Sequence, residues 1–246
     1  MFKSVAKPLL FMFCSVFALS AHAQNLVSNG DFEAGLADWT IWSAPDTGFW
    51  SSNWIHANDC DIWVPTNGCP NEGSISHSQK KGTDARNAHG GIYQVLSVEA
   101  GESYTVSGNW SGGVTGRESF NATWWEVVVY DGAVSDAVID QAPGPQDTLI
   151  AKREVTNLED GQVFQFQWEP FSGQFVAPSD TVTLAFKQGS LDTFEAAAYH
   201  DAISVTSNRI PSIPTLSTFA LLVLLGLFAL VALRHGPGMA IGRWPR

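Results

Sequence analysis

IYQVLSVEAGESYTVSGNW, the stretch from Ile92 to Trp110, consists of two short β-prone runs on either side of four turn-forming residues. The second run, Ser103–Trp110, places most of its large apolar side chains at every second position, which is the period of a half-buried strand. Glu99-Ala100-Gly101-Glu102 has the composition of a hairpin turn. We therefore expect Ile92–Val98 and Ser103–Trp110 to form neighbouring antiparallel strands.

Similar runs, rich in Val, Thr, Phe, Tyr and Trp, continue along the chain and are separated by Gly, Pro, Asn and Asp. No amphipathic helix stands between them. Seven or more strands at this spacing predict an all-β, antiparallel jelly-roll sandwich that forms one domain over residues 24–208. The additional expected strands are Ala122–Tyr130, Leu149–Val155, Val163–Glu169, Thr181–Lys187 and Ala198–Thr206.

Residues 43–90 have a different character. They contain Trp50, Trp54 and Trp63 among many Ser, Asn, Gly and Asp residues, with no clean period. This composition predicts a long loop region that carries aromatic and polar side chains. Loops of this length in a compact domain are usually functional.

Strand alternation predicts which side chains face the core. The inward set is Tyr104, Val106, Trp110, Trp125, Val127, Val129, Phe164, Phe166 and Trp168. The opposite faces then carry six side chains suited to stacking on sugar rings and binding hydroxyl groups: Trp124, Tyr130, Glu126, Asn109, Gln165 and Gln167. We expect these six to form a glycan platform, with Trp50 and Trp54 as the alternative site. The structural alternative is a second small core in which the 43–90 region covers Trp124 and Tyr130.

Three motifs, in order, carry a resemblance to a known family. NLVSNGDFE at Asn25–Glu33 precedes Trp39, GIYQ begins at Gly91 and leads to GESYTVS, and HDAISV begins at His200. Together they resemble the galactose-binding-like jelly rolls, which include carbohydrate-binding modules attached to bacterial cellulases and xylanases. The resemblance implies a sandwich fold, and this fold serves sugar binding, protein binding and pure architecture alike.

The same resemblance implies a structural calcium ion where the first and last strands meet. The implied ligands are Glu33 and Asp201, with backbone carbonyls near Asp31 completing the shell. Hard oxygen donors of this kind suit calcium. In this sequence His200 stands where the family often has a first Asp. The alternative is a solvated Glu and an Asp in a turn.

Two other functional classes stay open. Glu126 and Glu169 offer two carboxylates, as glycoside hydrolysis requires. However, the sequence contains no serine or cysteine nucleophile motif, and its loop histidines, such as His77 and His89, lack a metal-binding spacing. We therefore expect a non-enzyme. An adhesion or matrix protein, whose sandwich binds protein, is the alternative to a sugar-binding module.

The N-terminal residues 1–23 have the pattern of a secretory signal peptide. Lys3 and Lys7 precede the apolar segment Leu9–Leu19, and Ala21 and Ala23 occupy the positions that a signal peptidase reads. Cleavage there would leave Gln24 as the mature N-terminus.

The C-terminal residues predict a membrane anchor. Ile213-Pro214-Thr215-Leu216-Ser217 ends a linker over 209–217, residues 218–233 are almost entirely apolar, and the tail 234–246 has three arginines and no acidic residue. The eighteen residues Leu216–Leu233 are just long enough as a helix to cross a bilayer, and the positive tail places the C-terminus in the cytoplasm. The stretch resembles the Ile-Pro-Thr-Leu sorting signal of Gram-negative surface proteins. The resemblance implies that a membrane enzyme processes the tail and that the domain reaches the cell surface or extracellular matrix.

The exported part is strongly acidic. It has eight basic residues against all 24 acidic ones, a formal charge of −16. This charge excludes nucleic acid and anionic lipid headgroups as partners. Two of the three cysteines, Cys60 and Cys69, lie in this part, and an oxidising compartment favours a disulfide between them.

Overall fold

The computed structural model describes residues 24–45, 50–56, 71–81, 86–209 and 225–226. The chain divides into two compact units, residues 1–209 and 210–246. The expected signal peptide, Cys60, Cys69, the sorting motif and nearly all of the expected membrane helix lie outside the described residues. Among the residues that are described, no helix is long and apolar enough to cross a membrane.

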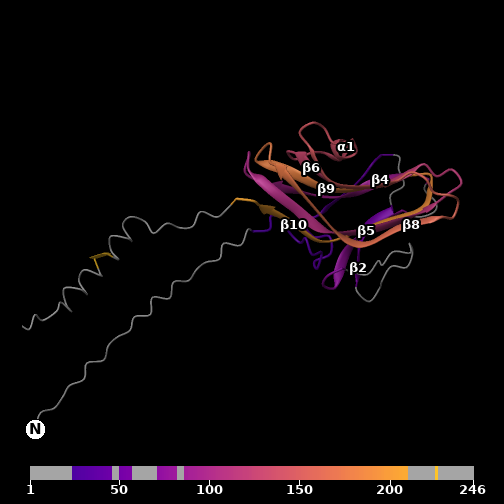
Figure 1. Ribbon diagram of the computed structural model, residues 1–246, viewed down its shortest axis with the longest axis horizontal. Helices are drawn as coiled ribbons and strands as arrows, with labels where there is room; N and C mark the ends of the chain where they lie inside the picture. Colours follow the sequence, from indigo (N-terminus) through magenta and orange to yellow (C-terminus); the bar gives the residue numbers. More distant parts are fainter. Residues whose placement is uncertain (1–23, 46–49, 57–70, 82–85, 210–224, 227–246) are drawn as a thin grey trace, which may run out of the picture. The chain divides into compact units, whose positions relative to one another are not determined.

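The first unit is built almost entirely from strands (Figure 1). Within the described part of this unit, the one helix is the short α1 (Asp136–Ile139). The strands are β1 (Thr40–Ser43), β2 (Trp50–His56), β3 (Ile75–Lys81), β4 (Ala88–Ser97), β5 (Ser103–Gly116), β6 (Ala122–Asp131), β7 (Thr148–Val155), β8 (Val163–Val176), β9 (Thr181–Leu191) and β10 (Thr193–Ser207).

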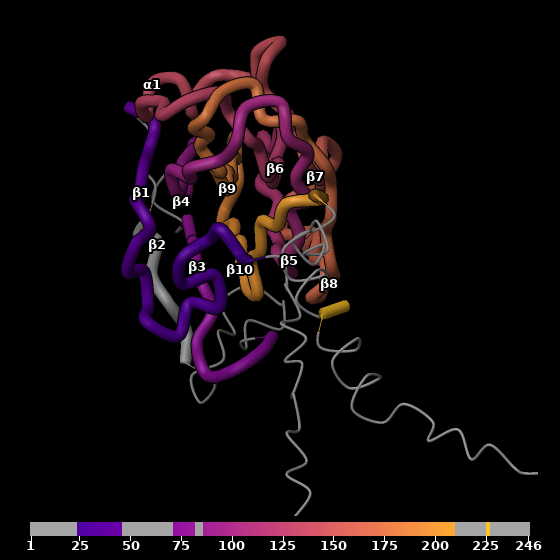
Figure 2. The backbone as a smooth tube through the Cα atoms, turned by 90° about the vertical axis from the view of Figure 1, so that its left-hand side faces the viewer, coloured from indigo at the N-terminus to yellow at the C-terminus, as the bar shows by residue number. Residues whose placement is uncertain are grey.

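The ten strands form two five-stranded sheets, which we call the first and second sheet. The first has the order β1-β4-β9-β6-β7, and the second has the order β2-β3-β10-β5-β8. Every pairing is antiparallel. In Figure 2 the strands of each sheet follow one another from left to right in this order. Two antiparallel sheets with almost no helix match the predicted jelly-roll sandwich, and all seven predicted strands are present.

The predicted hairpin between residues 92 and 110 is wrong. β4 pairs with β1 and β9 in the first sheet, whereas β5 pairs with β10 and β8 in the second. The turn at residues 99–102 does form, with a Glu102 N–H to Glu99 O hydrogen bond and Gly101 at a φ of 81°. This turn carries the chain from the first sheet to the second. The composition of the turn does not specify whether the strands that it joins pair with each other or lie in different sheets.

The prediction of a loop over residues 43–90 is also wrong in part, because β2, β3 and the start of β4 lie there. β3 reads ISHSQKK and has the composition of a loop, yet it pairs with β2 and β10 inside the second sheet. Tertiary contacts stabilise this polar strand. His77 Nδ1 lies 2.9 Å from His200 Nδ1 in the core, and Lys81 Nζ donates to the Thr193 carbonyl at 2.7 Å.

The predicted core faces are confirmed with one exception. A single apolar cluster fills the space between the sheets and contains the whole predicted inward set apart from Trp168, with Phe164 at its margin. A bulge in β8 accounts for Trp168. Trp110 pairs with Glu169 and Gly112 with Phe166, so Gln167 and Trp168 together oppose one residue of β5. The alternation shifts there, and Trp168 packs against Tyr199 in a separate small cluster.

Candidate functional site

The six residues of the predicted glycan platform do not lie on one surface. Asn109, Gln165 and Gln167 belong to β5 and β8 of the second sheet, whereas β6, with Trp124, Glu126 and Tyr130, lies in the first sheet. The outward faces of the two layers of a sandwich point in opposite directions. The platform prediction is therefore wrong as a single site.

Tyr130 is a core residue. Its side chain is fully buried in a second apolar cluster with Trp42, Val128, Ile139 and Ala185 on the outer face of the first sheet. Its hydroxyl donates to the Ile139 carbonyl at 3.1 Å, which ties α1 down over the sheet. The alternative of a second small core is thus correct for Tyr130. Among the described residues, the cover comes from Trp42, Val134 and Ile139, and the described part of 43–90 contributes nothing to this cluster.

Trp124 and Glu126 do share a pocket, also on the outer face of the first sheet. The cavity has a volume of about 210 Å³. It lies where β4, β6, β7 and β9 meet the chain just after α1. Its lining is His89, Trp124, Glu126, Asp140, Gln141, Ala142, Lys152 and Lys187. We call it the outer-face pocket.

The Trp124 side chain lies flat on the sheet because the neighbouring strand has a glycine beneath it. Trp124 pairs with Gly189 of β9, and a Cβ atom at Gly189 would overlap the indole ring. The His89 ring lies 5.5 Å from Trp124, centroid to centroid, and buttresses it. Trp124 itself is only half-buried. One wall of the pocket is therefore a fixed, partly exposed aromatic plate.

The floor of the pocket is charged. Lys187, opposite Glu126 in the strand register, is 2% exposed. Its Nζ donates to the Gln141 carbonyl at 2.8 Å and to the Tyr130 hydroxyl at 3.0 Å, and lies 3.6 Å from Glu126 Oε2. Burial lowers the pKa of the Lys187 ammonium, and the Glu126 carboxylate opposes that shift. Lys152 Nζ lies 3.4 Å from the other oxygen of Glu126.

His89 and Asp140 complete the pocket. His89 Nδ1 lies 2.7 Å from Asp140 Oδ1. Burial lowers the pKa of His89 below its ordinary value, although the hydrogen bond to Asp140 works the other way. The imidazole is therefore neutral at neutral pH and donates its Nδ1 proton to the carboxylate. The bond fixes the ring beside Trp124 and anchors the chain after α1.

Sequence reasoning missed His89, Asp140 and Lys187 as members of this site. From the sequence, His89 is a loop histidine without a metal-binding spacing, and Lys187 is the last residue of an expected strand. The register that brings Lys187 opposite Glu126 is a long-range pairing. The one local signal was Gly189, since a glycine inside a strand often marks a place where another group approaches closely.

The remaining predicted residues lie elsewhere. Trp50 and Trp54 belong to β2, at an edge of the second sheet, and their side chains are outside the described set. Glu169 lies on the second sheet and is engaged by Arg153 through both carboxylate oxygens at 2.6 Å. Trp110 Nε1 also donates to it at 3.0 Å. Glu126 and Glu169 are therefore on different sheets, and Glu169 does not line the outer-face pocket.

The expected calcium ligands both bind the segment 71–75. Glu33 Oε1 accepts the N–H groups of Ser74 at 2.5 Å and Ile75 at 3.0 Å. Asp201 Oδ2 accepts those of Asn71 at 3.0 Å and Glu72 at 2.8 Å. Burial raises the pKa of Asp201 to about 6, although these hydrogen bonds act to lower it. His200, its neighbour, points the other way and packs in the core.

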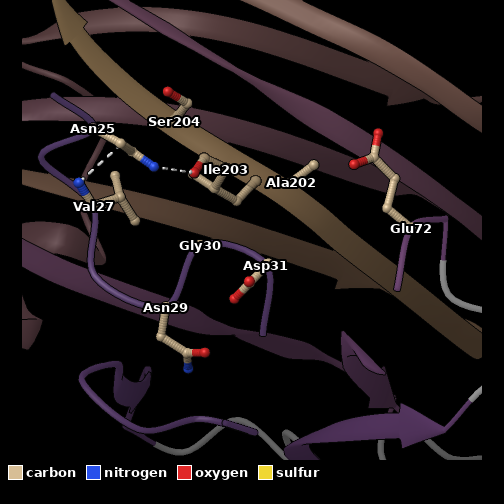
Figure 3. Close-up of a pocket in the computed structure, with 9 residues that line it drawn as sticks. All are labelled: Asn25, Val27, Asn29, Gly30, Asp31, Glu72, Ala202, Ile203 and Ser204. Carbon is tan, nitrogen blue, oxygen red and sulfur yellow. Dashed lines mark hydrogen bonds between the residues drawn. The ribbon is translucent and has the colours of Figure 1, made fainter. Parts of the chain in front are cut away.

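A shallow pocket of about 370 Å³ adjoins this junction (Figure 3). Asp31 and Glu72 present carboxylates there, and Asn25 donates to the Ile203 carbonyl at 3.1 Å, which joins the opening segment to β10. The oxygen donors fit calcium in kind, and Glu33 Oε2 accepts no hydrogen bond among the described residues. Within the same part of the chain, no group of three or more His, Cys, Asp or Glu side chains is arranged to hold a metal.

No protein-family model matches the sequence, and no curated protein does. Solved structures with a similar chain path include the module TmCBM61 in complex with β-1,4-galactotriose, at 13% identity and a TM-score of 0.45, covering 76% of this chain and 100% of that one. The CBM22-1 xylan-binding domain of Paenibacillus barcinonensis Xyn10C has 14% identity and a TM-score of 0.41, covering 76% and 97%. The K1 cleaved adhesin domain of Lys-gingipain from Porphyromonas gingivalis has 11% identity and a TM-score of 0.46, covering 73% and 96%. Likenesses at this level do not assign the chain to any of these groups.

Proposed function

We propose that this protein is a non-catalytic carbohydrate-binding module and that the outer-face pocket binds a sugar unit of an extracellular or cell-envelope polysaccharide. The observation that carries the proposal is Trp124, held flat over Gly189 beside the carboxylate of Glu126. Sugar recognition needs a flat apolar surface for the C–H face of the ring. It also needs fixed hydrogen-bonding groups for the hydroxyls at the ring's edge.

The polar groups of the pocket supply both kinds of hydrogen-bonding partner. Glu126 and Asp140 accept, and the ammonium of Lys152 donates. Lys187 holds Glu126 in place from beneath, so the carboxylate is positioned before a ligand arrives. A preformed site loses less conformational entropy on binding than a mobile one.

A glycan array probed with the full-length protein tests this proposal. We expect binding to a limited set of neutral polysaccharides or oligosaccharides. Gln165→Ala, on the outward face of the second sheet, is the matched control and should leave the binding pattern unchanged. If Gln165→Ala abolished binding while the protein stayed folded, the site would lie on the second sheet. An array with no bound glycan would favour the adhesion alternative.

We also propose that calcium binds at the junction of Glu33, Asp201 and the 71–75 segment and stabilises it, with carbonyls near Asp31 as further ligands. The support is the supply of hard oxygen donors where the two ends of the domain meet. The Asp201 carboxylate already accepts hydrogen bonds from the N–H groups of Asn71 and Glu72. A calcium ion would therefore further stabilise a segment that these hydrogen bonds already hold.

Removal of calcium with EDTA should lower the melting temperature of the full-length protein. An ion present at about 100 times its dissociation constant contributes about 2.7 kcal/mol, which corresponds to roughly 5–10 °C for a domain of this size. Glu33→Gln keeps an oxygen acceptor for Ser74 and Ile75 but removes the charge, so it should make the melting curve insensitive to EDTA. A wild-type curve that EDTA does not move would show that hydrogen bonds alone hold this segment.

For its location, we propose export followed by tethering through the C-terminal apolar segment and processing by a membrane enzyme. This proposal rests on the sequence motifs at the two ends. Mature protein in the outer cell fraction should begin at Gln24, which N-terminal sequencing or mass spectrometry would establish. Recovery of chains that begin at Met1 from that fraction would contradict it. The Cys60–Cys69 disulfide remains a prediction, because it depends on the oxidising compartment that export would provide.

A further inference from the structure

We propose that the outer-face pocket receives a single neutral sugar unit at a chain end or side branch, and not a run of units within a chain. This inference rests on the proposed sugar-binding function and adds the form of the ligand to it. Three observations support it: the size of the cavity, the segment that closes its side, and the balance of its charges.

The cavity is small. Its volume is about 210 Å³. Pockets for drug-sized ligands measure about 300–1,000 Å³. A cavity below this range suits one pyranose ring with its hydroxyl groups better than two linked rings.

The outer face of the first sheet is blocked beside the pocket. Asp140, Gln141 and Ala142 line the cavity. The chain just before them lies over Val128 and Tyr130, and both of these are fully buried. A polysaccharide chain that lay along the sheet would have to pass through this segment.

The blocking segment is fastened from below. Lys187 Nζ bonds to the Gln141 carbonyl at 2.8 Å, and the Tyr130 hydroxyl bonds to the Ile139 carbonyl at 3.1 Å. His89 holds Asp140 at 2.7 Å. Three side chains from three strands therefore hold residues 139–141 in place. This segment closes one side of the pocket. On this side a sugar chain cannot continue along the sheet, and we infer that its end unit occupies the pocket while the rest of the chain extends into solvent.

The charges of the pocket favour a neutral sugar. Its two carboxylates, Glu126 and Asp140, are matched by the ammonium groups of Lys152 and Lys187. Lys152 also lies 2.9 Å from Glu154 at the rim, so no cation is left without an acidic partner. A uronic acid or sulfated sugar would bring an unmatched negative charge. The pocket is therefore suited to hydroxyl groups alone.

A length series tests this inference. The dissociation constants of the full-length protein should be measured by isothermal titration calorimetry with β-1,4-linked gluco-, xylo- and galacto-oligosaccharides of one, two and four units. In the series that binds, we expect less than a threefold difference between one unit and four. Limited hydrolysis of the matching polysaccharide at constant mass, which multiplies its chain ends, should increase the amount of protein bound in proportion.

The outcomes separate the inference from the function on which it rests. Tenfold or greater tightening from one unit to four, still lost in Trp124→Ala, would overturn the single-unit inference and leave sugar binding at the pocket intact. Preference for a uronic acid over its neutral counterpart would overturn the choice of a neutral sugar. Unchanged binding in folded Trp124→Ala, or no binding to any series, would instead overturn the proposed function.

Discussion

Trp125→Ala should lower the free energy of unfolding by about 3–5 kcal/mol, the range for removal of a large buried aromatic side chain. Trp125 is 1% exposed and packs between the sheets against Phe164 and Phe166. Its Nε1 donates to the Ala197 carbonyl of the opposite sheet at 2.9 Å. The substitution therefore leaves a cavity in the centre of the sandwich and removes a hydrogen bond between the two sheets.

Urea unfolding followed by circular dichroism would measure this loss. The neighbouring Trp124→Ala is the matched control, because Trp124 is half-buried on the outer face of the first sheet, where its ring packs against His89. We expect it to cost only about 1–2 kcal/mol, since it removes less apolar surface from water. Equal costs, or a larger cost for Trp124→Ala, would contradict the assignment of the two faces.

The sequence was sufficient to predict the strands β4 to β10 and most of their faces. In β6 the alternation of Trp125, Val127 and Val129 with Trp124 and Glu126 is a local property, because successive side chains of a strand point to opposite sides. The structure confirms this division, because Trp125, Val127 and Val129 belong to the core between the sheets whereas Trp124 and Glu126 line the outer-face pocket. Local patterns of this kind survive whatever partners the strand later acquires.

Pairing between strands could not be predicted in the same way. The turn at Glu99–Glu102 looks the same whether it joins two strands of one sheet or crosses between layers. The platform prediction failed for this reason, since it assumed that Trp124 and Gln165 share a layer. β3 was missed because His77 and Lys81 gain their partners only in the folded chain. The bulge that turns Trp168 outward also depends on the neighbouring strand.

The candidate site was predicted only in part, for the same physical reason. Trp124 and Glu126 follow from alternation within one strand. Lys187 joins them through the β6–β9 register, and Asp140 through the chain after α1. Neither relation leaves a periodic signal in the sequence. For Tyr130 the predicted face is correct, but the predicted exposure is wrong. A face that points away from the core can still be covered, as Tyr130 is by the second apolar cluster.

Trp124→Ala should weaken sugar binding by about ten- to a hundredfold while the domain stays folded. Loss of an aromatic side chain at a binding hot spot costs roughly 1–3 kcal/mol or more, and each 1.4 kcal/mol is tenfold in affinity. Gly189→Ala gives an independent route to the same result. The added Cβ would overlap the indole and push it off the sheet without removing it.

The most direct test of sugar binding at the outer-face pocket is calorimetric titration with the oligosaccharide that binds wild type. Four proteins should be compared: wild type, Trp124→Ala, Gly189→Ala and Gln165→Ala. Circular dichroism should first show that all four proteins are folded. Sugar binding at the outer-face pocket predicts at least a tenfold loss in the two variants of the first sheet and wild-type affinity in Gln165→Ala. Wild-type affinity in both Trp124→Ala and Gly189→Ala would contradict it.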